Sequence, residues 1–264
     1  MVTLETAIAE FERHGSTDVG YLRLHFSRFA TTKGLLERTW PRAGGRVLDI
    51  GAHWLHQSYL YACDGYEVWA ADMSPMLDLP PVRNVAAAHG IRLVAYDDLA
   101  RGHAFAAIPD DSFDIILFTE ILEHLAFNPV ALWRELHRVL APGGRIVLTT
   151  PNFLALRTLV RRWKASVTRS GGGLSVEQIL RTPTYGHHWK EYSLAELEEY
   201  FSLLSPDFVV RQALHVEDYY GSTSLAGRCA RPIERLISPL RPHLHLEVEL
   251  TGKRNGVMRD PAWT

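Results

Sequence analysis

The chain has 264 residues, of which 47% are hydrophobic and 22% are charged, and its formal net charge is −2. These values are typical of a globular protein and exclude disorder, collagen-like repeats or a coiled coil as descriptions of the whole chain. The length fits one large domain or two small ones. The near-neutral charge supplies no overall field for nucleic acid or an anionic membrane, so we expect neither as a partner.

The sequence predicts a soluble protein of the cytoplasm. Its apolar runs fall short of the ~20 residues that a membrane-spanning helix needs. Glu5, Glu10 and Glu12 stand where a secretion signal would be basic and then apolar. The cysteines, Cys63 and Cys229, are too few for a disulfide framework, which fits a reducing compartment.

Two amphipathic helices are expected first, over residues 3–14 and 21–39, and from Arg46 onward short apolar runs alternate with helix-like segments. The expected strands cover 46–51, 66–72, 92–97, 113–119, 145–150, 208–216 and 245–253. The first five are almost continuously apolar, which is typical of a parallel sheet covered on both faces. The predicted fold class is therefore α/β, a doubly wound, Rossmann-like sheet with helices on both faces.

These elements suggest how the chain is divided. We expect an N-terminal helical lid over 1–40 and a main domain over 41–264. Within the main domain, residues 151–192 break the alternation of strands and helices, so they are expected to form an inserted cap over one end of the sheet. Ser193 and Glu196, with the spacing of a capping box, predict the start of the next helix.

In a doubly wound sheet, ligands bind beyond the carboxyl ends of the strands, where the strand order reverses. The polar residues expected at those ends are Asp49, Gly51, Asp72, Asp97, Asp98, Thr119 and Glu120. An acid after the second strand suits a ribose, because one carboxylate accepts hydrogen bonds from both hydroxyls of the diol. Neither a G-x-G-x-x-G sequence nor a phosphate-binding P-loop is present. The pattern predicts a nucleoside ligand without phosphates.

The ordered motifs VLDIG, VWAAD, DDSFDIILFTEILEHL and ELHRVLAPGGRIVLTTPN resemble those of the class I S-adenosylmethionine-dependent methyltransferases. The resemblance covers roughly residues 45–152 and continues at 186–201. It implies S-adenosylmethionine as the cofactor and an antiparallel last strand at 245–253. By that likeness the amino-acid part of the cofactor would lie at Asp49 and Gly51, the ribose at Asp72, and the adenine at Met73 and at Asp97 or Asp98, with His53 and Thr119 completing the expected cofactor-binding set.

The turn after the first strand departs from the family pattern. The family has D-x-G-x-G-x-G, whereas this chain reads Asp49-Ile50-Gly51-Ala52-His53-Trp54-Leu55, so two glycines are replaced by residues with side chains. One interpretation is a wider turn that still binds the cofactor. The other is a weakened or lost cofactor site.

The sequence Glu120-x-x-Glu123-His124 follows the fourth strand, and its spacing places the three side chains on one face if a helix begins there. Three interpretations stay open. The group can be structural; His124, with an ordinary pKa near 6.5, can be the base that takes a proton from a hydroxyl acceptor; or the group can hold a metal. The predicted catalytic set is His124, Glu120 and Glu123.

The metal interpretation comes from a resemblance in spacing to small-RNA 3′-terminal 2′-O-methyltransferases and some ubiquinone-pathway O-methyltransferases, in which such a group holds Mg²⁺ or Zn²⁺. That resemblance implies a fourth ligand at His187 or His188. We expect no metal, although a divalent ion at Glu120, Glu123, His124 and His188 stays open.

Residues 151–190 are strongly basic, with seven cations against the single acid Glu177: Arg157, Arg161, Arg162, Lys164, Arg169, Arg181 and Lys190. A solvated helix face is one interpretation. The other is that Arg161 or Arg162 binds a phosphate or carboxylate of the acceptor. The remaining residues expected at the acceptor are Tyr185, His187, His188, Trp189 and Tyr192.

The predicted function is methyl transfer from S-adenosylmethionine to an oxygen, or less readily a nitrogen, of a small molecule or glycan precursor, which would be anionic if the arginines bind it. Two alternatives from other classes are a metal-dependent RNA 2′-O-methyltransferase and a non-catalytic binding protein that resembles a methyltransferase. The loss of the two glycines motivates the second alternative.

Overall fold

The structure is a computed structural model that describes residues 2–16, 19–42, 44–167, 176–181, 183–220 and 225–261. Arg169 therefore lies outside the described residues. The side chains of Arg161 and Lys164 lie outside them as well.

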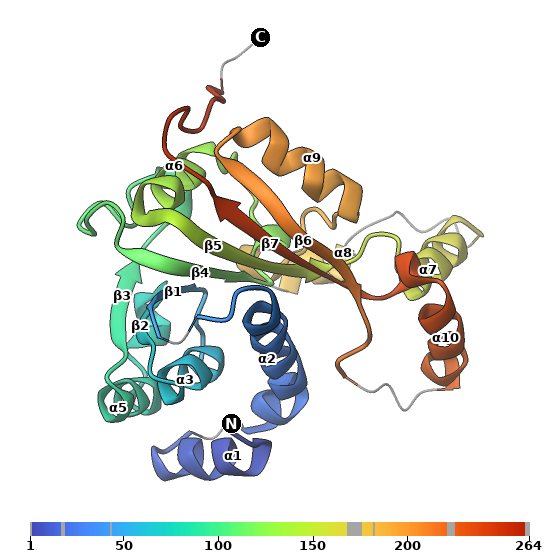
Figure 1. Cartoon of the computed structure of the whole chain (residues 1–264). Coiled ribbons are helices and arrows are strands. Elements are labelled where there is room, and N and C mark those ends of the chain that lie inside the picture. The colour runs from blue at the N-terminus through green and yellow to red at the C-terminus, as the bar shows by residue number, and fades with distance from the viewer. Residues whose placement is uncertain are drawn as a thin grey trace.

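The centre of the fold is a seven-stranded sheet with the order β3-β2-β1-β4-β5-β7-β6 (Figure 1). The strands are β1 (Arg46–Ile50), β2 (Glu67–Met73), β3 (Arg92–Tyr96), β4 (Phe113–Thr119), β5 (Leu140–Pro151), β6 (Phe208–Val216) and β7 (His243–Leu250). Neighbouring strands are parallel except where β7 pairs with β5 and β6. The predicted fold class is confirmed, with the strand order reversing between β1 and β4.

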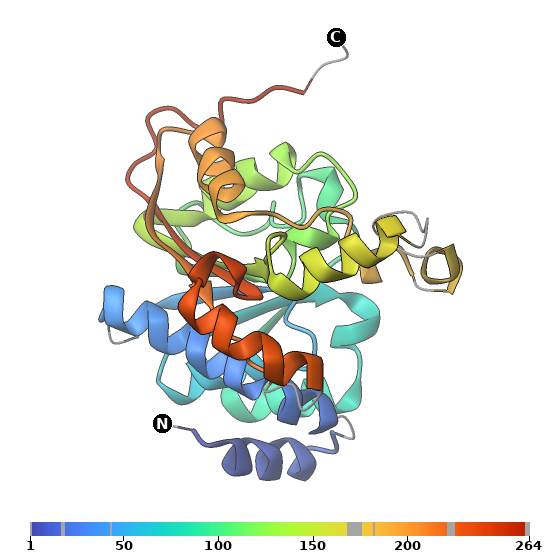
Figure 2. The same cartoon turned by 90° about the vertical axis from the view of Figure 1, so that its right-hand side faces the viewer.

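Helices cover both faces of the sheet (Figures 1 and 2). The helices are α1 (Leu4–Arg13), α2 (Val19–Thr39), α3 (His56–Cys63), α4 (Ser74–Leu77), α5 (Pro80–His89), α6 (Val130–Val139), α7 (Leu156–Val167), α8 (Val176–Arg181), α9 (Leu194–Leu204) and α10 (Leu225–Leu236), with 3₁₀ turns at Leu99–Arg101, Leu122–His124, Thr184–Gly186 and Ser238–Leu240. In Figure 1, α1, α2, α3 and α5 lie on one side of the sheet, and α6 and α9 lie on the other.

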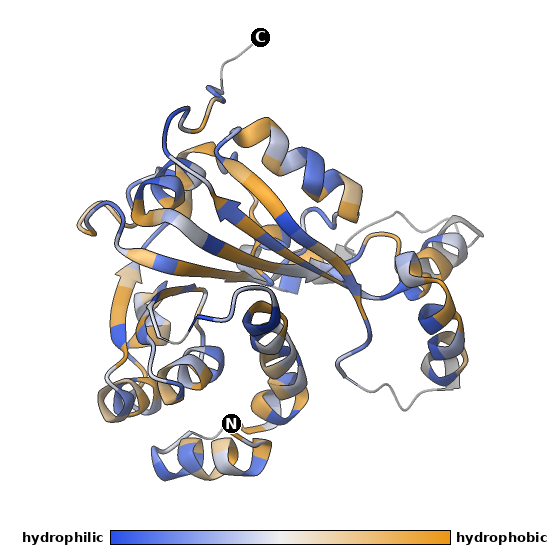
Figure 3. Ribbon diagram, in the orientation of Figure 1, coloured by the Kyte–Doolittle hydropathy of each residue, from blue (hydrophilic) through white to orange (hydrophobic). Residues whose placement is uncertain are grey.

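An apolar core fills the space on each side of the sheet. Phe11 of α1 and Leu22 of α2 belong to one core, and Trp133 of α6 and Phe201 of α9 belong to the other; each is at most 1% exposed. Figure 3 shows hydrophobic residues along the central strands, which are covered on both faces. That double burial explains why the first strands have continuous rather than alternating apolar residues.

Two local expectations had different outcomes. The capping box is confirmed, because the Ser193 hydroxyl accepts from the Glu196 N–H while the Glu196 carboxylate accepts from the Ser193 N–H. The fifth strand is longer than predicted, since it begins at Leu140, which pairs with Phe113. The chain enters the sheet directly from α6, so α6 ends without a separate loop.

Candidate functional site

The carboxyl ends of the parallel strands β1 to β4 border one cavity of about 510 Å³. Small-molecule pockets usually measure about 300 to 1,000 Å³. All eight residues expected to bind the cofactor line it: Asp49, Gly51, His53, Asp72, Met73, Asp97, Asp98 and Thr119. The reversal of strand order brings these strand ends to one place. Their roles toward a ligand stay predictions.

The turn after β1 keeps a glycine-like backbone at all three positions of the motif. Gly51, His53 and Leu55 have φ values of 73°, 49° and 64°, in the left-handed region. A Cβ atom on Gly51 would lie 2.2 Å from Ile121 Cδ1, so a side chain there would require Ile121 to move. Leu55 is 0% exposed and packs into the core, so of the two residues that replace glycines, His53 is the one that lines the cavity.

This left-handed backbone at two non-glycine residues is strained. Such a conformation costs about 1–3 kcal/mol per residue and persists only where the surrounding structure enforces it. Here the His53 N–H donates to the Asp72 carboxylate at 2.7 Å, and the Leu55 side chain is anchored in the core. These contacts therefore hold the turn in its left-handed conformation without the two glycines.

Asp72 and Asp49 are buried carboxylates in the cavity wall. One oxygen of Asp72 accepts from the His53 N–H and the other from the Met73 N–H, each at 2.7 Å. Asp49 accepts from the Ser58 hydroxyl at 2.6 Å. Burial, together with the negative charge of Asp72, raises the pKa of Asp49 to about 7 against the opposing effect of the Ser58 hydrogen bond. A cationic ligand group would favour the ionised form of Asp49.

Asp98 and Thr119 already have protein partners. Asp98 accepts from the Ala100 N–H at 2.8 Å and so caps the 3₁₀ turn at 99–101. The Thr119 hydroxyl donates to Gln57 Oε1 at 2.9 Å, while the buried Gln57 Nε2 has no hydrogen-bond partner among the described residues. Gln57 also lines the cavity, so this amide can donate to a ligand.

No α-helix begins at Glu120, so the condition for Glu120, Glu123 and His124 to share one helical face is not met. Glu120 has a left-handed φ of 56°, and the residues after it form only the 3₁₀ turn at 122–124. The physical reason is that the Glu120 N–H donates to Thr149 O of β5 at 2.8 Å. This bond extends the hydrogen bonding between β4 and β5 by one residue and forces the chain to turn sharply at Glu120. The carboxylate of Glu120 lies 3.5 Å from the guanidinium of Arg28.

Arg28 of α2 is a cavity residue that the sequence analysis missed. It is 6% exposed, its Nη atoms lie 3.5 Å from Glu120 Oε2 and from the hydroxyls of Tyr21 and Tyr220, and its Nε has no partner among the described residues. Burial acts to lower the pKa of Arg28, but Glu120 and the tyrosines outweigh it and raise the pKa above the usual value. The cation is therefore kept beside the cavity, and the sequence alone carried no signal that separates it from other helical arginines.

Three of the four residues of the predicted metal set converge. The ligand atoms of Glu123, His124 and His188 lie within 4.8 Å of one another. Glu120 is not part of this group among the described residues, because its turn directs it to Arg28. The group could hold a metal ion with three protein ligands.

The same group also suits proton transfer. His124 lines the cavity, its Nδ1 lies 3.2 Å from the carbonyl oxygen of His187, and its ring centroid is 4.7 Å from that of His188. Burial, with a contribution from His188, lowers the pKa of His124 below its usual value, which favours the neutral ring. Glu123 is 0% exposed and accepts from the Thr150 hydroxyl; burial and Glu120 raise its pKa.

Of the other residues predicted at the acceptor, Tyr185 alone lines the cavity within the described part of the chain. His187 is 4% exposed, and its carbonyl faces His124. Trp189 is 49% exposed, and Tyr192 packs against the core of α6 and α9. Sequence proximity to the histidines did not place Trp189 or Tyr192 in the cavity wall, because the chain leaves the cavity after 186.

Several cations of the basic segment have acidic partners. The ion pairs join Arg157 to Asp218, Arg181 to Glu177 and Lys190 to Glu196, at 2.8, 2.7 and 2.8 Å. The Arg162 guanidinium stacks on the Phe153 ring at 3.4 Å and does not line the cavity. These contacts favour the structural interpretation for the four residues.

The wall also contains aromatic residues that the sequence analysis did not select: Tyr21, Phe29, Trp54, Tyr96 and Phe127. Tyr21 and Phe29 come from α2, and Tyr96 ends β3. Their spacing is that of ordinary core residues, so only the tertiary structure distinguishes them.

Comparisons with known proteins agree with this geometry. A family model described as a methyltransferase domain matches residues 24–203. The ubiquinone biosynthesis O-methyltransferase of Xanthomonas oryzae pv. oryzae is 32% identical over 158 residues, which are 57% of this chain and 57% of that protein. This chain thus matches little more than half the length of that curated relative.

Solved structures share the fold. The PH0226 protein of Pyrococcus horikoshii OT3 has a TM-score of 0.57 and 18% identity, with 86% of this chain and 91% of that chain covered. The Burkholderia thailandensis 1,6-didemethyltoxoflavin-N1-methyltransferase, solved with S-adenosylhomocysteine, has a TM-score of 0.53 and 16% identity, with 96% and 92% covered. None of the helices in the described part of the chain combines the length and apolar character needed to cross a membrane.

Proposed function

The chain belongs to the class I S-adenosylmethionine-dependent methyltransferases, and from this premise we propose that it transfers a methyl group to a hydroxyl oxygen of a small molecule. The observation that carries the proposal is that His124 lines the same cavity as Asp49, Gly51 and Asp72. Strand-end residues suited to a nucleoside and a neutral imidazole therefore share one wall. The name of the Xanthomonas relative, an O-methyltransferase, supports oxygen as the acceptor atom.

The polar and charged groups of the cavity suit S-adenosylmethionine. Each Asp72 oxygen accepts one backbone N–H and keeps a lone pair for a ribose hydroxyl. Asp97 suits the adenine amino group better than Asp98, because Asp98 caps a turn. At the other end, Arg28 would meet the carboxylate of the amino-acid part and Asp49 its ammonium group, pairing opposite charges.

When bound, S-adenosylmethionine supplies a methyl group on a positively charged sulfur, ready for in-line displacement. The protein must then orient the acceptor and receive its proton. The carbonyl of His187 can only accept a hydrogen bond, so His124 carries its hydrogen on Nδ1 and has a free lone pair on Nε2. Nε2 of His124 would then receive the proton of the acceptor hydroxyl when the bound cofactor supplies its methyl group.

The lining of the cavity favours a flat acceptor. Phe29, Phe127 and Tyr185 supply aromatic surface, and the cavity is partly closed by α2. A phenolic hydroxyl has a pKa near 10, which a neutral histidine can assist as a base while the methyl group transfers. We therefore propose that the acceptor is a hydroxylated aromatic molecule rather than a glycan precursor.

The test is methyl transfer from labelled S-adenosylmethionine to a panel of phenols, sugar nucleotides and structured RNA. We expect label in the phenols, and loss of it in His124→Ala. Binding of S-adenosylhomocysteine with no turnover on any arm would instead support a non-catalytic binding protein. Transfer to RNA alone would refute the small-molecule proposal.

A further inference from the structure

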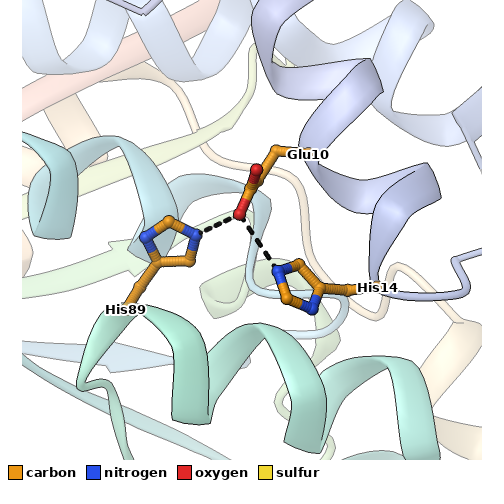
Figure 4. Close-up of side chains that lie close together, drawn as sticks. All are labelled: Glu10, His14 and His89. Atoms are coloured by element: carbon orange, nitrogen blue, oxygen red, sulfur yellow. Dashed lines mark hydrogen bonds and ion pairs between the residues drawn. The ribbon is translucent and has the colours of Figure 1, made fainter.

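A second group of metal-ligand side chains lies away from the cavity, where the N-terminal helix meets α5. Glu10 lies in the last turn of α1, His14 is the residue directly after that helix, and His89 is the last residue of α5 (Figure 4). One oxygen of Glu10, Oε1, lies 3.1 Å from His14 Nε2 and 2.8 Å from His89 Nε2. Figure 4 shows both rings turned toward this oxygen from opposite helices.

The three side chains are held in place before any ion binds. Their exposed fractions are 13% for Glu10, 19% for His14 and 21% for His89, so each is largely covered by protein. The i, i+4 spacing puts the cap residue His14 on the same side of the α1 terminus as Glu10. The His89 ring packs edge-on against the Tyr59 ring at a centroid distance of 4.8 Å, which limits its rotation.

The distances are close to those of a metal-bound set. Three ligands at 2.0–2.1 Å from a tetrahedral ion lie about 3.3 Å from one another. The two contacts to Glu10 are only a few tenths of an ångström shorter, and all three ligand atoms lie within 4.8 Å of one another. Small side-chain movements would open a space for an ion between them.

The donor set selects the kind of ion. Two imidazole nitrogens and one carboxylate oxygen suit Zn²⁺ and its transition-metal neighbours, whereas Mg²⁺ and Ca²⁺ prefer oxygen ligands. Partial burial acts to raise the pKa of Glu10, but hydrogen bonds from Arg13, His89 and His14 outweigh it and lower the pKa to about 2. The carboxylate is thus ionised at neutral pH, as a ligand must be.

Arg13 is the competitor for this carboxylate. Its Nη2 lies 2.6 Å from the same Glu10 oxygen, and its side chain is 68% exposed. An exposed arginine can move into water at little cost, because solvent-exposed ion pairs contribute little to stability. An ion on Glu10 would therefore displace the Arg13 contact rather than be excluded by it.

We propose that Glu10, His14 and His89 bind one divalent transition-metal ion, with Zn²⁺ the best fit, and that the ion joins α1 to α5. This joint would steady the wall of the cavity, because Phe11 of α1 packs on the ring of His56, a cavity residue, at a centroid distance of 4.5 Å. The role is structural and requires nothing of the reaction. Affinity should follow the order Mn²⁺, Fe²⁺, Co²⁺, Zn²⁺ from weakest to tightest.

The experiment titrates the metal-free full chain with Zn²⁺ by calorimetry and with Co²⁺ by visible absorption. We expect one equivalent to bind at this site, and His89→Ala to weaken it by more than about 100-fold, since even outer-shell partners account for 10- to 100-fold. His103→Ala, which removes an exposed histidine outside the cluster, should change nothing. Arg13→Ala should tighten binding by removing the competitor.

Two further measurements distinguish this site from the histidine group at the cavity. Zn²⁺ should raise the unfolding temperature of the native chain with increasing concentration but not that of His89→Ala, whose fold is checked by circular dichroism. His188→Ala removes one ligand of the other group, Glu123, His124 and His188, and so tests whether Zn²⁺ binds there instead. Equal Zn²⁺ affinity in the native chain and His89→Ala, or loss of binding in His188→Ala alone, would overturn the proposal. These readouts do not use methyl transfer, so they stand apart from the proposed function.

Discussion

Replacing Asp72 with alanine tests the cofactor site most directly. The carboxylate is 7% exposed, and its two oxygens each keep one lone pair after accepting the His53 and Met73 N–H groups. If these lone pairs accept the two ribose hydroxyls, the variant loses hydrogen bonds to a charged group, each about 1.5–3 kcal/mol. Two such bonds amount to about 3–6 kcal/mol, so we expect affinity for S-adenosylhomocysteine to fall by about 10²- to 10⁴-fold, since 1.4 kcal/mol is tenfold.

The same substitution should also loosen the turn after β1. The N–H groups of His53 and Met73 lose their acceptor, and an unsatisfied buried donor costs about 1–3 kcal/mol. Asp72→Asn separates the two effects, because its single amide oxygen can keep one N–H bond without the charge. We expect Asp72→Asn to recover more of the stability than of the affinity.

Calorimetry with S-adenosylhomocysteine gives the affinity, and urea unfolding gives the stability. Asp78→Ala is the matched control, since Asp78 is an exposed acid that follows α4 and pairs with Arg83 at the surface. It should leave both quantities unchanged. An Asp72→Ala protein that is folded and binds with native affinity would refute the assignment of the ribose to Asp72.

His124→Ala should lower kcat by about 10²- to 10⁴-fold and leave the affinity for S-adenosylhomocysteine unchanged. Full activity in this variant would show that His124 has only a structural role. Because Glu120 pairs with Arg28 and is not among the converging ligands Glu123, His124 and His188, we expect methyl transfer to survive exhaustive EDTA; loss of activity restored by Mg²⁺ or Zn²⁺ would favour a metal there. Burial, helped by His53 and His25, lowers the pKa of His56 to about 3, so the unfolded chain takes up this proton below pH 6.5 and the native chain does not. At about 1.4 kcal/mol per pH unit, the native chain should therefore lose about 2 kcal/mol of unfolding free energy between pH 6.5 and 5, and His56→Phe should not show this loss. Urea unfolding at each pH measures it, and the same pH dependence in both proteins would contradict the prediction. Asp207→Ala should lower the free energy of unfolding by about 3–5 kcal/mol in the same assay. The variant leaves the buried His137 ring and the N–H groups of Asn255 and Gly256 without their acceptor. A loss below about 1 kcal/mol would show that water takes the place of the Asp207 carboxylate.

The strands along the chain and the residues at their ends could be predicted from the sequence alone. Continuous apolar runs identify strands buried on both faces, and the residue that ends each parallel strand must lie at the same edge of the sheet. Asp49, Asp72 and Thr119 could therefore be brought together without coordinates, and the structure places all three in one cavity wall. Local chemistry also sufficed for the capping box at Ser193.

Backbone conformation at the two turns was decided only in the folded chain. His53 and Leu55 take left-handed φ values that their side chains disfavour, because Asp72 and the core hold them there. Glu120 takes the same conformation because β5 supplies an acceptor for its N–H. Propensity could not foresee either turn, since the stabilising partners are distant in sequence.

Packing between distant elements decided the rest of the site. Arg28 reaches the cavity because α2 lies against the sheet ends, and His89 meets Glu10 because α5 ends beside α1. In the sequence, a charged residue on a helix and a histidine at a helix end are both ordinary surface features. Their chemistry depends on the groups that face them, and those contacts exist only once the helices have packed.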